Sequence, residues 1–491
     1  MSPGETHKNY SVRLEYLLVA GVLFFYLPHL PRFFMGDDWL WLAQAERAMT
    51  DFSQLFSRSI YGYFRPFYLL YITLIYKLFG MHAFWFGLTG LLWHILNCHL
   101  LLKVLEKLRF PVTAAFIAAL IFGFYYLEAS TICWISAGSD IITLTLLLTL
   151  TRLLLAYFDE FTFTRLVLIV LVFLMALLVK ELGFVGIALY FLLPFLYKKN
   201  PFRKRYLGGT VILLLLAAGY LMYYFTTRTV VDKVLITNLQ DFFVNLWYFF
   251  IYLFLPLSKR MVTLFGSGHE EMLTVLRGVF VFALPLTWLL LIKRALAGER
   301  YFLLWPFILM APVAVFDWSL GLFDLYPERT ISRFMYAAVP GPAVVLGAIF
   351  TRLFDGVLRR WPARATVIII FILFNFVVIH NVTGLYKTRQ EVSHDIYRQL
   401  SEYRDTFASC ESLHIYLSDT TDAPSELTNP LVMNAMGRVV FNREMTVRVF
   451  VVSDLLERLP EDYPGCTLKW LGPEGRLSPV WSQTPSRART K

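Results

Sequence analysis

The sequence is poor in charge: Asp, Glu, Lys and Arg make up only 16% of its 491 residues, against about 25% in soluble domains. A soluble chain of this length would also divide into domains joined by polar linkers. Instead, apolar runs close to the roughly 20 residues that a bilayer requires recur between Leu14 and Leu385. A soluble globular protein is therefore excluded, and the pattern is typical of a membrane protein with many spans.

The chain also lacks most catalytic signatures. It has no phosphate-cradling glycine-rich loop, no nucleophile elbow, no dinucleotide fingerprint and no internal repeat. No cluster of His, Cys, Asp and Glu has the spacing of metal ligands, so we assign no metal and no confident cofactor, although an acidic pair could hold a divalent metal. The chain has no CxxC motif. Cys410 and Cys466 lie in a polar C-terminal segment and are disulfide candidates if that segment lies outside the cytosol.

The apolar runs predict about eleven transmembrane helices. We expect these helices at residues 15–31, 84–103, 111–127, 139–157, 165–180, 182–197, 207–225, 275–292, 301–316, 334–350 and 365–384. Basic clusters follow the second, sixth, eighth and tenth runs, and all fall in the cytoplasm if the N-terminus is cytoplasmic. This rule accounts for the net charge of +10 without a nucleic-acid partner. A bacterial inner membrane is the simplest location.

Two further apolar stretches fit this topology poorly. Residues 67–79 are short and contain Lys77, and residues 242–257 would invert every later helix if they crossed the membrane. We therefore place both at the outer interface, as amphipathic or re-entrant segments.

From Tyr386 the sequence becomes mixed and polar. Leu413–Leu417 and Arg438–Phe441 have strand-like patterns, and Val452–Leu459 has a helical one. The predicted fold class is an all-α polytopic membrane bundle with a small C-terminal α/β domain outside the membrane. We expect the bundle at residues 1–385, with a first outer loop of amphipathic helices at 32–83, and a periplasmic or lumenal domain at 386–491.

Ionisable residues outside the basic clusters gather on the outer face of this topology. Such groups are costly at membrane depth and are usually paired or functional, so their convergence predicts one polar cavity there. They are Asp37, Asp38, Glu128, Asp140, Lys180, Glu181, Asp317, Asp324, Glu328, Arg329 and Arg333.

Several of these acidic and basic groups have two interpretations. The Asp37–Asp38 pair could begin a solvated loop, but its aromatic neighbours can desolvate a carboxylate and make it a better base. Lys180–Glu181 interrupts an apolar run, either as a structural ion pair or as part of a site. Glu128 and Asp140 are the candidate partners of Lys180.

The remaining polar candidates are also ambiguous. Arg329 and Arg333 are either interfacial anchors or phosphate ligands, since guanidinium groups bind phosphate in a bidentate manner. His94 and Asn97 lie three residues apart and share a helix face, where polar contact between helices is the first interpretation.

Six motifs, in order along the chain, resemble those of the GT-C membrane glycosyltransferases. The nearest resemblance is to protein O-mannosyltransferases of the tetratricopeptide-repeat type and their bacterial relatives, here without the repeats, and to aminoarabinose transferases. The motifs are Gly36-Asp37-Asp38-Trp39, Phe64-Arg65-Pro66-Phe67, His94-Ile95-Leu96-Asn97, Glu128 through Trp134-Ile135-Ser136 to Asp140, Val179-Lys180-Glu181-Leu182-Gly183, and Ser332-Arg333-Phe334-Met335-Tyr336. Two family features are replaced, a His-Pro-x-His by Phe124–Leu127 and an arginine by Gly138.

The resemblance implies a glycosyltransferase that moves a hexosyl, mannosyl or aminosugar group from a polyprenyl-phosphate donor, with inversion, on the periplasmic or lumenal face. The acceptor would be a hydroxyl group of a protein, lipid or glycan. The family's acidic pair implies Asp37, with Asp38, as the general base. The leaving phosphate requires cations, for which Arg333 is favoured, with Lys180 and Arg329 in support. The expected supporting residues are Glu128, Asp140, Glu181, Arg65, His94 and Asn97.

Other classes of function stay open at this stage. A transporter or lipid flippase would have inverted repeats and paired broken helices near the midplane, and the sequence shows no similarity between its halves. A membrane scaffold without activity is a second alternative. An O-antigen-ligase-like enzyme is a third, although its large outer loop usually comes late in the chain.

Overall fold

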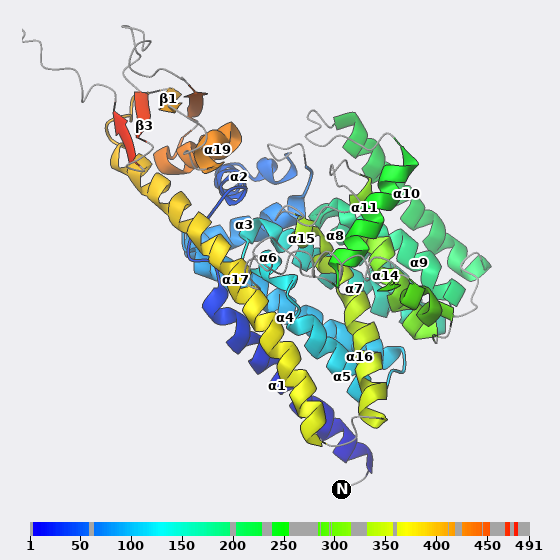
Figure 1. Ribbon diagram of the computed structural model, residues 1–491. Coiled ribbons are helices and arrows are strands. Elements are labelled where there is room, and N and C mark those ends of the chain that lie inside the picture. Colours follow the sequence, from blue (N-terminus) through cyan, green and yellow to red (C-terminus); the bar gives the residue numbers. More distant parts are fainter. Residues whose placement is uncertain are drawn as a thin grey trace, which may run out of the picture. The chain divides into compact units, whose positions relative to one another are not determined.

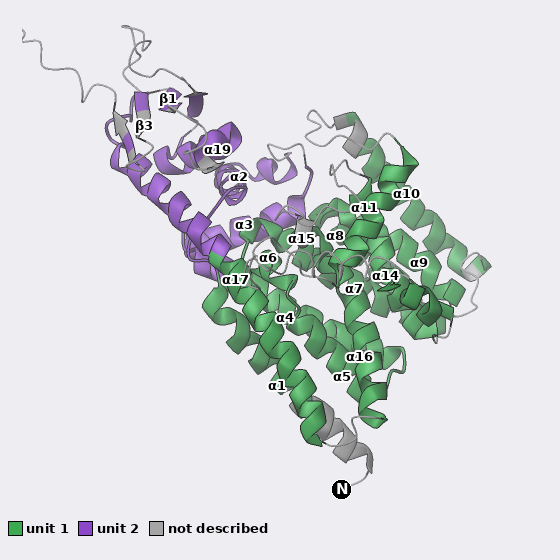
Figure 2. Ribbon diagram, in the orientation of Figure 1, with its two compact units in different colours: residues 1–30, 87–384 green, residues 31–86, 385–491 purple. Residues whose placement is uncertain are grey.

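The computed structural model describes residues 3–479 except 58–62, 197–202, 228–237, 255–282, 285, 294, 296, 316–330, 357–360, 411, 418–424, 444, 452–466 and 472–475. Within the described residues the chain is mostly helical (Figure 1). It divides into two compact units (Figure 2). Unit 1 contains residues 1–30 and 87–384, and unit 2 contains residues 31–86 and 385–491.

Unit 1 is a helical bundle. Its longer helices are α1 (Pro3–Tyr26), α4 (Ala83–Lys107), α5 (Val112–Gly123), α7 (Gly138–Asp159), α8 (Phe163–Val179), α9 (Val185–Leu196), α10 (Lys204–Thr227), α11 (Leu239–Tyr252), α14 (Ala297–Ala314), α16 (Pro340–Asp355) and the first part of α17 (Trp361–Glu402). Short helical turns interrupt the bundle at α6 (Glu128–Ile132), α15 (Ile331–Met335), η1 (Leu27–His29), η3 (Ile135–Ala137), η4 (Glu181–Phe184) and η6 (Tyr336–Ala338).

The helices coincide with the predicted spans. Half of the predicted span 275–292 lies outside the described residues, and the rest of it is helical. Among the described residues, four helical stretches are long and apolar enough to cross a membrane, and several shorter helices are also apolar. The four are 83–107, 135–159, 206–223 and 361–402. The chain is therefore a multi-pass membrane protein, while the number of eleven spans and the orientation of the termini stay predictions.

The two apolar stretches that fitted the topology poorly form helices. They correspond to α3 (Pro66–Phe79) and to α11, each of 14 residues. At 1.5 Å per residue such a helix is about 21 Å long, shorter than the bilayer core of about 30 Å. The shorter helices α5 and α9, each of 12 residues, coincide with predicted spans, so the interfacial placement of both segments stays a prediction.

Small residues allow close helix packing in unit 1. Helix α16 packs along α5, and a Cβ atom added at Gly347 would lie 2.8 Å from the backbone nitrogen of Ala118. Lipid tails are as apolar as leucine, so helices in a membrane associate through such close van der Waals contact. The contact fixes α16, and α16 continues from the α15–η6 turn that carries Arg333.

Unit 2 combines helices with a small sheet. Its helical elements are α2 (Asp38–Thr50), η2 (Phe52–Phe56), α3, the second part of α17, α18 (Ser425–Thr428) and α19 (Pro430–Phe441). Its strands are β1 (Ser412–Leu417), β2 (Thr446–Val451), β3 (Thr467–Leu471) and β4 (Arg476–Pro479), in the order β2-β1-β3-β4. β1 pairs parallel with β2 and β3, and β4 is antiparallel to β3. This sheet and α19 confirm an α/β fold at the C-terminus.

One predicted strand is wrong. Arg438–Phe441 forms the end of α19, and the strand lies instead at Thr446–Val451. The helix begins at Asn429, whose side chain accepts hydrogen bonds from the backbone N–H groups of Leu431 and Val432. Once the helix has started, its apolar face is buried against β2, so tertiary packing overrides the local strand pattern. The predicted helix at 452–459 lies outside the described residues.

The cysteines divide into two groups. Cys410 is disulfide-bonded, whereas Cys98 and Cys133 are free and buried. The fourth cysteine, Cys466, lies outside the described residues.

Helix α2 holds unit 2 together. Trp39 stacks on Tyr397 of α17 with 5.3 Å between ring centroids, and its Nε1 donates a hydrogen bond of 2.9 Å to Ser393 Oγ. On the same helix, Glu46 lies 3.6 Å from Arg438 of α19. The first outer loop therefore packs with the C-terminal segment, a grouping that the sequence did not predict.

We predict that Trp39→Ala strongly destabilises unit 2, because the side chain is fully buried and such truncations cost about 3–5 kcal/mol. Thermal unfolding of the detergent-solubilised protein measures the effect. The matched control is Phe52→Ala in the same unit, since Phe52 is 68% exposed. Equal stability of the two variants would contradict the role of Trp39.

Candidate active site

A buried ion pair lies at the centre of the candidate site in unit 1. Lys180 Nζ is 2.5 Å from Asp140 Oδ1, and their side chains are only 9% and 2% exposed. Asp140 lies in the first turn of α7, and Lys180 follows the last turn of α8. Each charge therefore sits at the helix end that its sign favours. The pair accounts for the lysine that interrupts an otherwise apolar segment.

Arg333 lies beside this pair, against two aromatic rings. The ring centroid of Phe334 is 4.9 Å from Lys180 Nζ and 4.8 Å from Arg333 Cζ. Arg333 Cζ is also 4.2 Å from the centroid of Trp134. Rings at these distances attract cations through their π faces. The aromatic side chains therefore hold two cations close together within unit 1.

Glu128 is buried apart from the Lys180 ion pair. The residue is 0% exposed, and neither carboxylate oxygen has a hydrogen-bond partner among the described residues. Burial raises the pKa of the Glu128 carboxyl well above its ordinary value. Of the two predicted partners of Lys180, Asp140 makes the contact. Glu128 is not exposed to a substrate in this conformation.

His94 and Asn97 connect helices, as the first interpretation of the sequence predicted. His94 Nδ1 lies 2.8 Å from the hydroxyl of Tyr336, and Asn97 Nδ2 donates to the same hydroxyl at 3.0 Å. Asn97 Nδ2 also donates to the carbonyl oxygen of Ile141 at 3.0 Å. All three polar side chains are fully buried. The network therefore ties α4 to α7 and to the turn that follows Arg333.

The acidic pair belongs to unit 2. Gly36 has a φ of +50°, a left-handed conformation that glycine adopts readily. The turn allows Asp38 Oδ2 to accept a hydrogen bond of 3.1 Å from the Met35 backbone N–H. Asp38 is 2% exposed, whereas Asp37, the N-cap residue of α2, is partly exposed. The two carboxylates thus have different environments, and Asp37 is the more accessible.

The other predicted site residues are placed as follows. Arg65 precedes α3 in unit 2, with its Cζ 4.3 Å from the ring centroid of Tyr63. Glu181 is partly exposed in η4, directly after Lys180. Arg329 lies outside the described residues. Within the described part of the chain, no group of three or more His, Cys, Asp or Glu side chains could hold a metal ion.

Sequence reasoning missed the aromatic part of the site. Trp134, Phe334 and Tyr336 all lie within the quoted motifs, yet none was proposed as a site residue. Their position next to predicted cations or polar residues was the available signal. Only the fold shows that they contact Arg333, Lys180, His94 and Asn97.

We predict that Asp140→Ala and Lys180→Met each destabilise the protein by about 3–5 kcal/mol, because each leaves an uncompensated buried charge. The double variant should be more stable than either single variant, since it buries no charge. Unfolding in detergent by denaturant checks this order. Additive losses in the double variant would show that the two residues act independently.

Solved structures of an archaeal oligosaccharyltransferase share the fold of the chain. Oligosaccharyltransferase AglB from Archaeoglobus fulgidus, in complex with an inhibitory peptide and a dolichol-phosphate, matches with a TM-score of 0.51 and 12% identity. The match covers 90% of this chain and 65% of that chain. The A. fulgidus oligosaccharyltransferase in complex with Zn and sulfate matches with a TM-score of 0.51 and 14% identity, over 89% of this chain and 62% of that chain. This chain therefore spans less than two thirds of the length of these oligosaccharyltransferases.

ArnT from Cupriavidus metallidurans in the apo state is similar as well, with a TM-score of 0.49 and 14% identity over 88% of this chain and 85% of that chain. No protein-family model and no curated protein sequence matches the chain. At these identities the likeness shows the fold alone. The chain has the fold of the A. fulgidus oligosaccharyltransferase.

Proposed function

We propose that the protein is a membrane glycosyltransferase that transfers a sugar from a polyprenyl-phosphate-linked donor to a hydroxyl acceptor, with inversion, on the periplasmic or lumenal face. The observation that carries this proposal is the cationic cluster of Lys180 and Arg333, which both contact the ring of Phe334, within a fold shared with an oligosaccharyltransferase that was solved with a dolichol-phosphate. A lipid phosphate is the group that such a cluster suits.

Arg333 is the proposed ligand of the donor phosphate. Its guanidinium lies against Trp134 and Phe334, so part of its conformational freedom is already lost before a ligand binds. A guanidinium also offers paired N–H donors to the phosphate oxygens. Lys180 has a supporting role, because Asp140 balances much of its charge. Arg329, outside the described residues, is a second candidate for this role.

Asp37 is the proposed general base. In the reaction, the acceptor oxygen bonds to the anomeric carbon, the bond from that carbon to the phosphate oxygen breaks, and the acceptor proton passes to the carboxylate. The polyprenyl phosphate leaves with the electron pair, and cations stabilise its charge. Asp37 suits the role better than Asp38, because Asp38 is buried and accepts a hydrogen bond from its own loop.

The other candidates have supporting roles in this proposal. Asp140 orients Lys180, and His94 and Asn97 position the turn after Arg333 through Tyr336. Glu181, which is partly exposed, is the proposed contact for sugar hydroxyls. Glu128 and Arg65 are the remaining supporting candidates.

We predict that Asp37→Asn lowers sugar transfer by about 10²–10⁴-fold, the usual contribution of a general base. The assay is transfer of labelled sugar from a panel of undecaprenyl-phosphate-linked donors in membranes. The control is Asp51→Asn, at an exposed carboxylate of the same unit. Asp38→Asn should cause a smaller loss, since its amide oxygen can still accept from Met35. Full activity of folded Asp37→Asn protein would refute its role as the base.

We predict that Arg333→Ala weakens donor binding and that Arg333→Lys restores it only in part, because lysine cannot make a bidentate contact. Binding of polyprenyl phosphate to the purified protein measures the effect. Arg165→Ala is the matched control, since Arg165 pairs with Glu160 in an exposed position elsewhere in unit 1. Unchanged affinity in Arg333→Ala would remove this residue from the phosphate site.

A further inference from the structure

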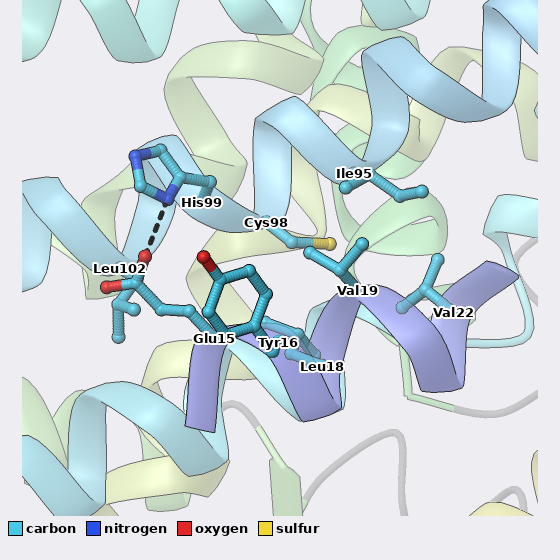
Figure 3. Close-up of a pocket in the computed structure, with 9 residues that line it drawn as sticks. All are labelled: Glu15, Tyr16, Leu18, Val19, Val22, Ile95, Cys98, His99 and Leu102. Carbon is cyan, nitrogen blue, oxygen red and sulfur yellow. Dashed lines mark ion pairs between the residues drawn. The ribbon is translucent and has the colours of Figure 1, made fainter. Parts of the chain in front are cut away.

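A second cavity lies between α1 and α4 in unit 1. Its volume is about 310 Å³. Aliphatic side chains form one part of its wall, and polar side chains form the other (Figure 3). The lining residues are Glu15, Tyr16, Leu18, Val19, Val22, Ile95, Cys98, His99 and Leu102. None of these is part of the site assigned to sugar transfer.

Glu15 and His99 line the polar end of this cavity, and Lys103 and Glu106 lie next to them, outside the lining. Glu15 Oε2 lies 3.1 Å from His99 Nδ1, and Glu15 Oε1 lies 2.7 Å from Lys103 Nζ. Lys103 Nζ is also 3.1 Å from Glu106 Oε2. These side chains are between 22% and 43% exposed, so a ligand can reach them. The cluster is at the end of α4 that carries the basic residues of a membrane boundary.

The aliphatic part of the cavity suits a hydrocarbon chain. Val19, Val22 and Ile95 lie together on the side away from the Glu15–His99 pair (Figure 3). Tyr16 is 71% exposed and lies beside the charged end, where an amphipathic ring suits the headgroup level of a membrane. The cavity therefore offers an apolar space that ends at a charged cluster. This arrangement matches the apolar acyl chain and the charged headgroup of a membrane lipid.

The charges select among lipid headgroups. Among the described side chains, a purely anionic headgroup would meet two carboxylates, Glu15 and Glu106, next to Lys103 and His99. A quaternary ammonium is usually bound by a cage of several aromatic rings, and Tyr16 is the one aromatic residue that lines this cavity. A primary ammonium, in contrast, donates hydrogen bonds to carboxylates, while its neighbouring phosphate can pair with a lysine.

We propose that this α1–α4 cavity binds one phospholipid with a phosphoethanolamine headgroup. Its ammonium group contacts the carboxylates of Glu15 and Glu106, its phosphate contacts Lys103, and one acyl chain lies along Val19 and Ile95. The site is independent of the proposed sugar transfer.

The experiment measures lipid that stays bound to the full-length protein. The protein is reconstituted in nanodiscs with equal parts of phosphatidylethanolamine, phosphatidylcholine and phosphatidylglycerol, and retained lipid is identified by native mass spectrometry after gentle extraction. We expect the wild type to retain phosphatidylethanolamine in preference to the other two. Glu15→Gln should lower its retention by about tenfold, equivalent to about 1.4 kcal/mol.

A cavity-filling variant tests the apolar part separately. Val19→Trp leaves every charge in place and fills the space for the acyl chain, so it should also lower retention about tenfold. The matched control is Glu160→Gln, which removes a carboxylate from an exposed ion pair on another loop of unit 1 and should retain the lipid. Thermal unfolding verifies that the variants are folded. If Glu15→Gln is unfolded, retention of phosphatidylethanolamine by Lys103→Gln and Val19→Trp tests the proposal instead, and both variants should retain less of it.

Three results would overturn the proposal. The first is equal retention of the three phospholipids by the wild type. The second is undiminished retention of phosphatidylethanolamine in folded Val19→Trp. The third is a loss in Glu160→Gln as large as in Glu15→Gln, which would indicate a general effect of surface charge.

Discussion

The ion pair between Asp140 and Lys180 is the constraint on which the polar interior of unit 1 depends. An isolated ammonium group at membrane depth is costly, and removing one partner of a buried pair leaves that cost uncompensated. The pair therefore fixes the end of α8 against the start of α7. With Lys180 held there, Phe334 and Arg333 pack beside it. One electrostatic requirement thus places the cations that we assign to the donor phosphate.

Polar contacts between helices reinforce this arrangement. The hydroxyl group of Tyr336 forms hydrogen bonds with the side chains of His94 and Asn97 of α4. Asn97 also donates a hydrogen bond to a backbone carbonyl of α7. Hydrogen bonds of this kind hold membrane helices together where hydrophobicity gives no preference. Because Tyr336 follows Arg333 by three residues, the network limits where the guanidinium can lie. His94 and Asn97 thus connect helices, which was the first interpretation of their spacing.

The acidic pair depends on a different set of contacts. Trp39, directly after Asp38, is fixed by Tyr397 and Ser393 of α17, so the loop that carries Asp37 is stabilised by a segment more than 350 residues later in the chain. The carboxylates of Asp37 and Asp38 differ in burial. Asp38 is the one that accepts a hydrogen bond from the Met35 backbone N–H within the loop. That difference supports Asp37 as the base in the proposed transfer.

The sequence by itself determined the membrane class and the position of most helices, because bilayer length and hydrophobic periodicity are local properties. It also identified Lys180 as an anomaly that required a partner. Only the tertiary structure decided that the partner is Asp140 and not Glu128, that Trp134 and Phe334 contact Arg333, and that Arg438–Phe441 is helical. These outcomes depend on contacts between residues far apart in the chain, and a one-dimensional pattern does not specify which buried groups meet.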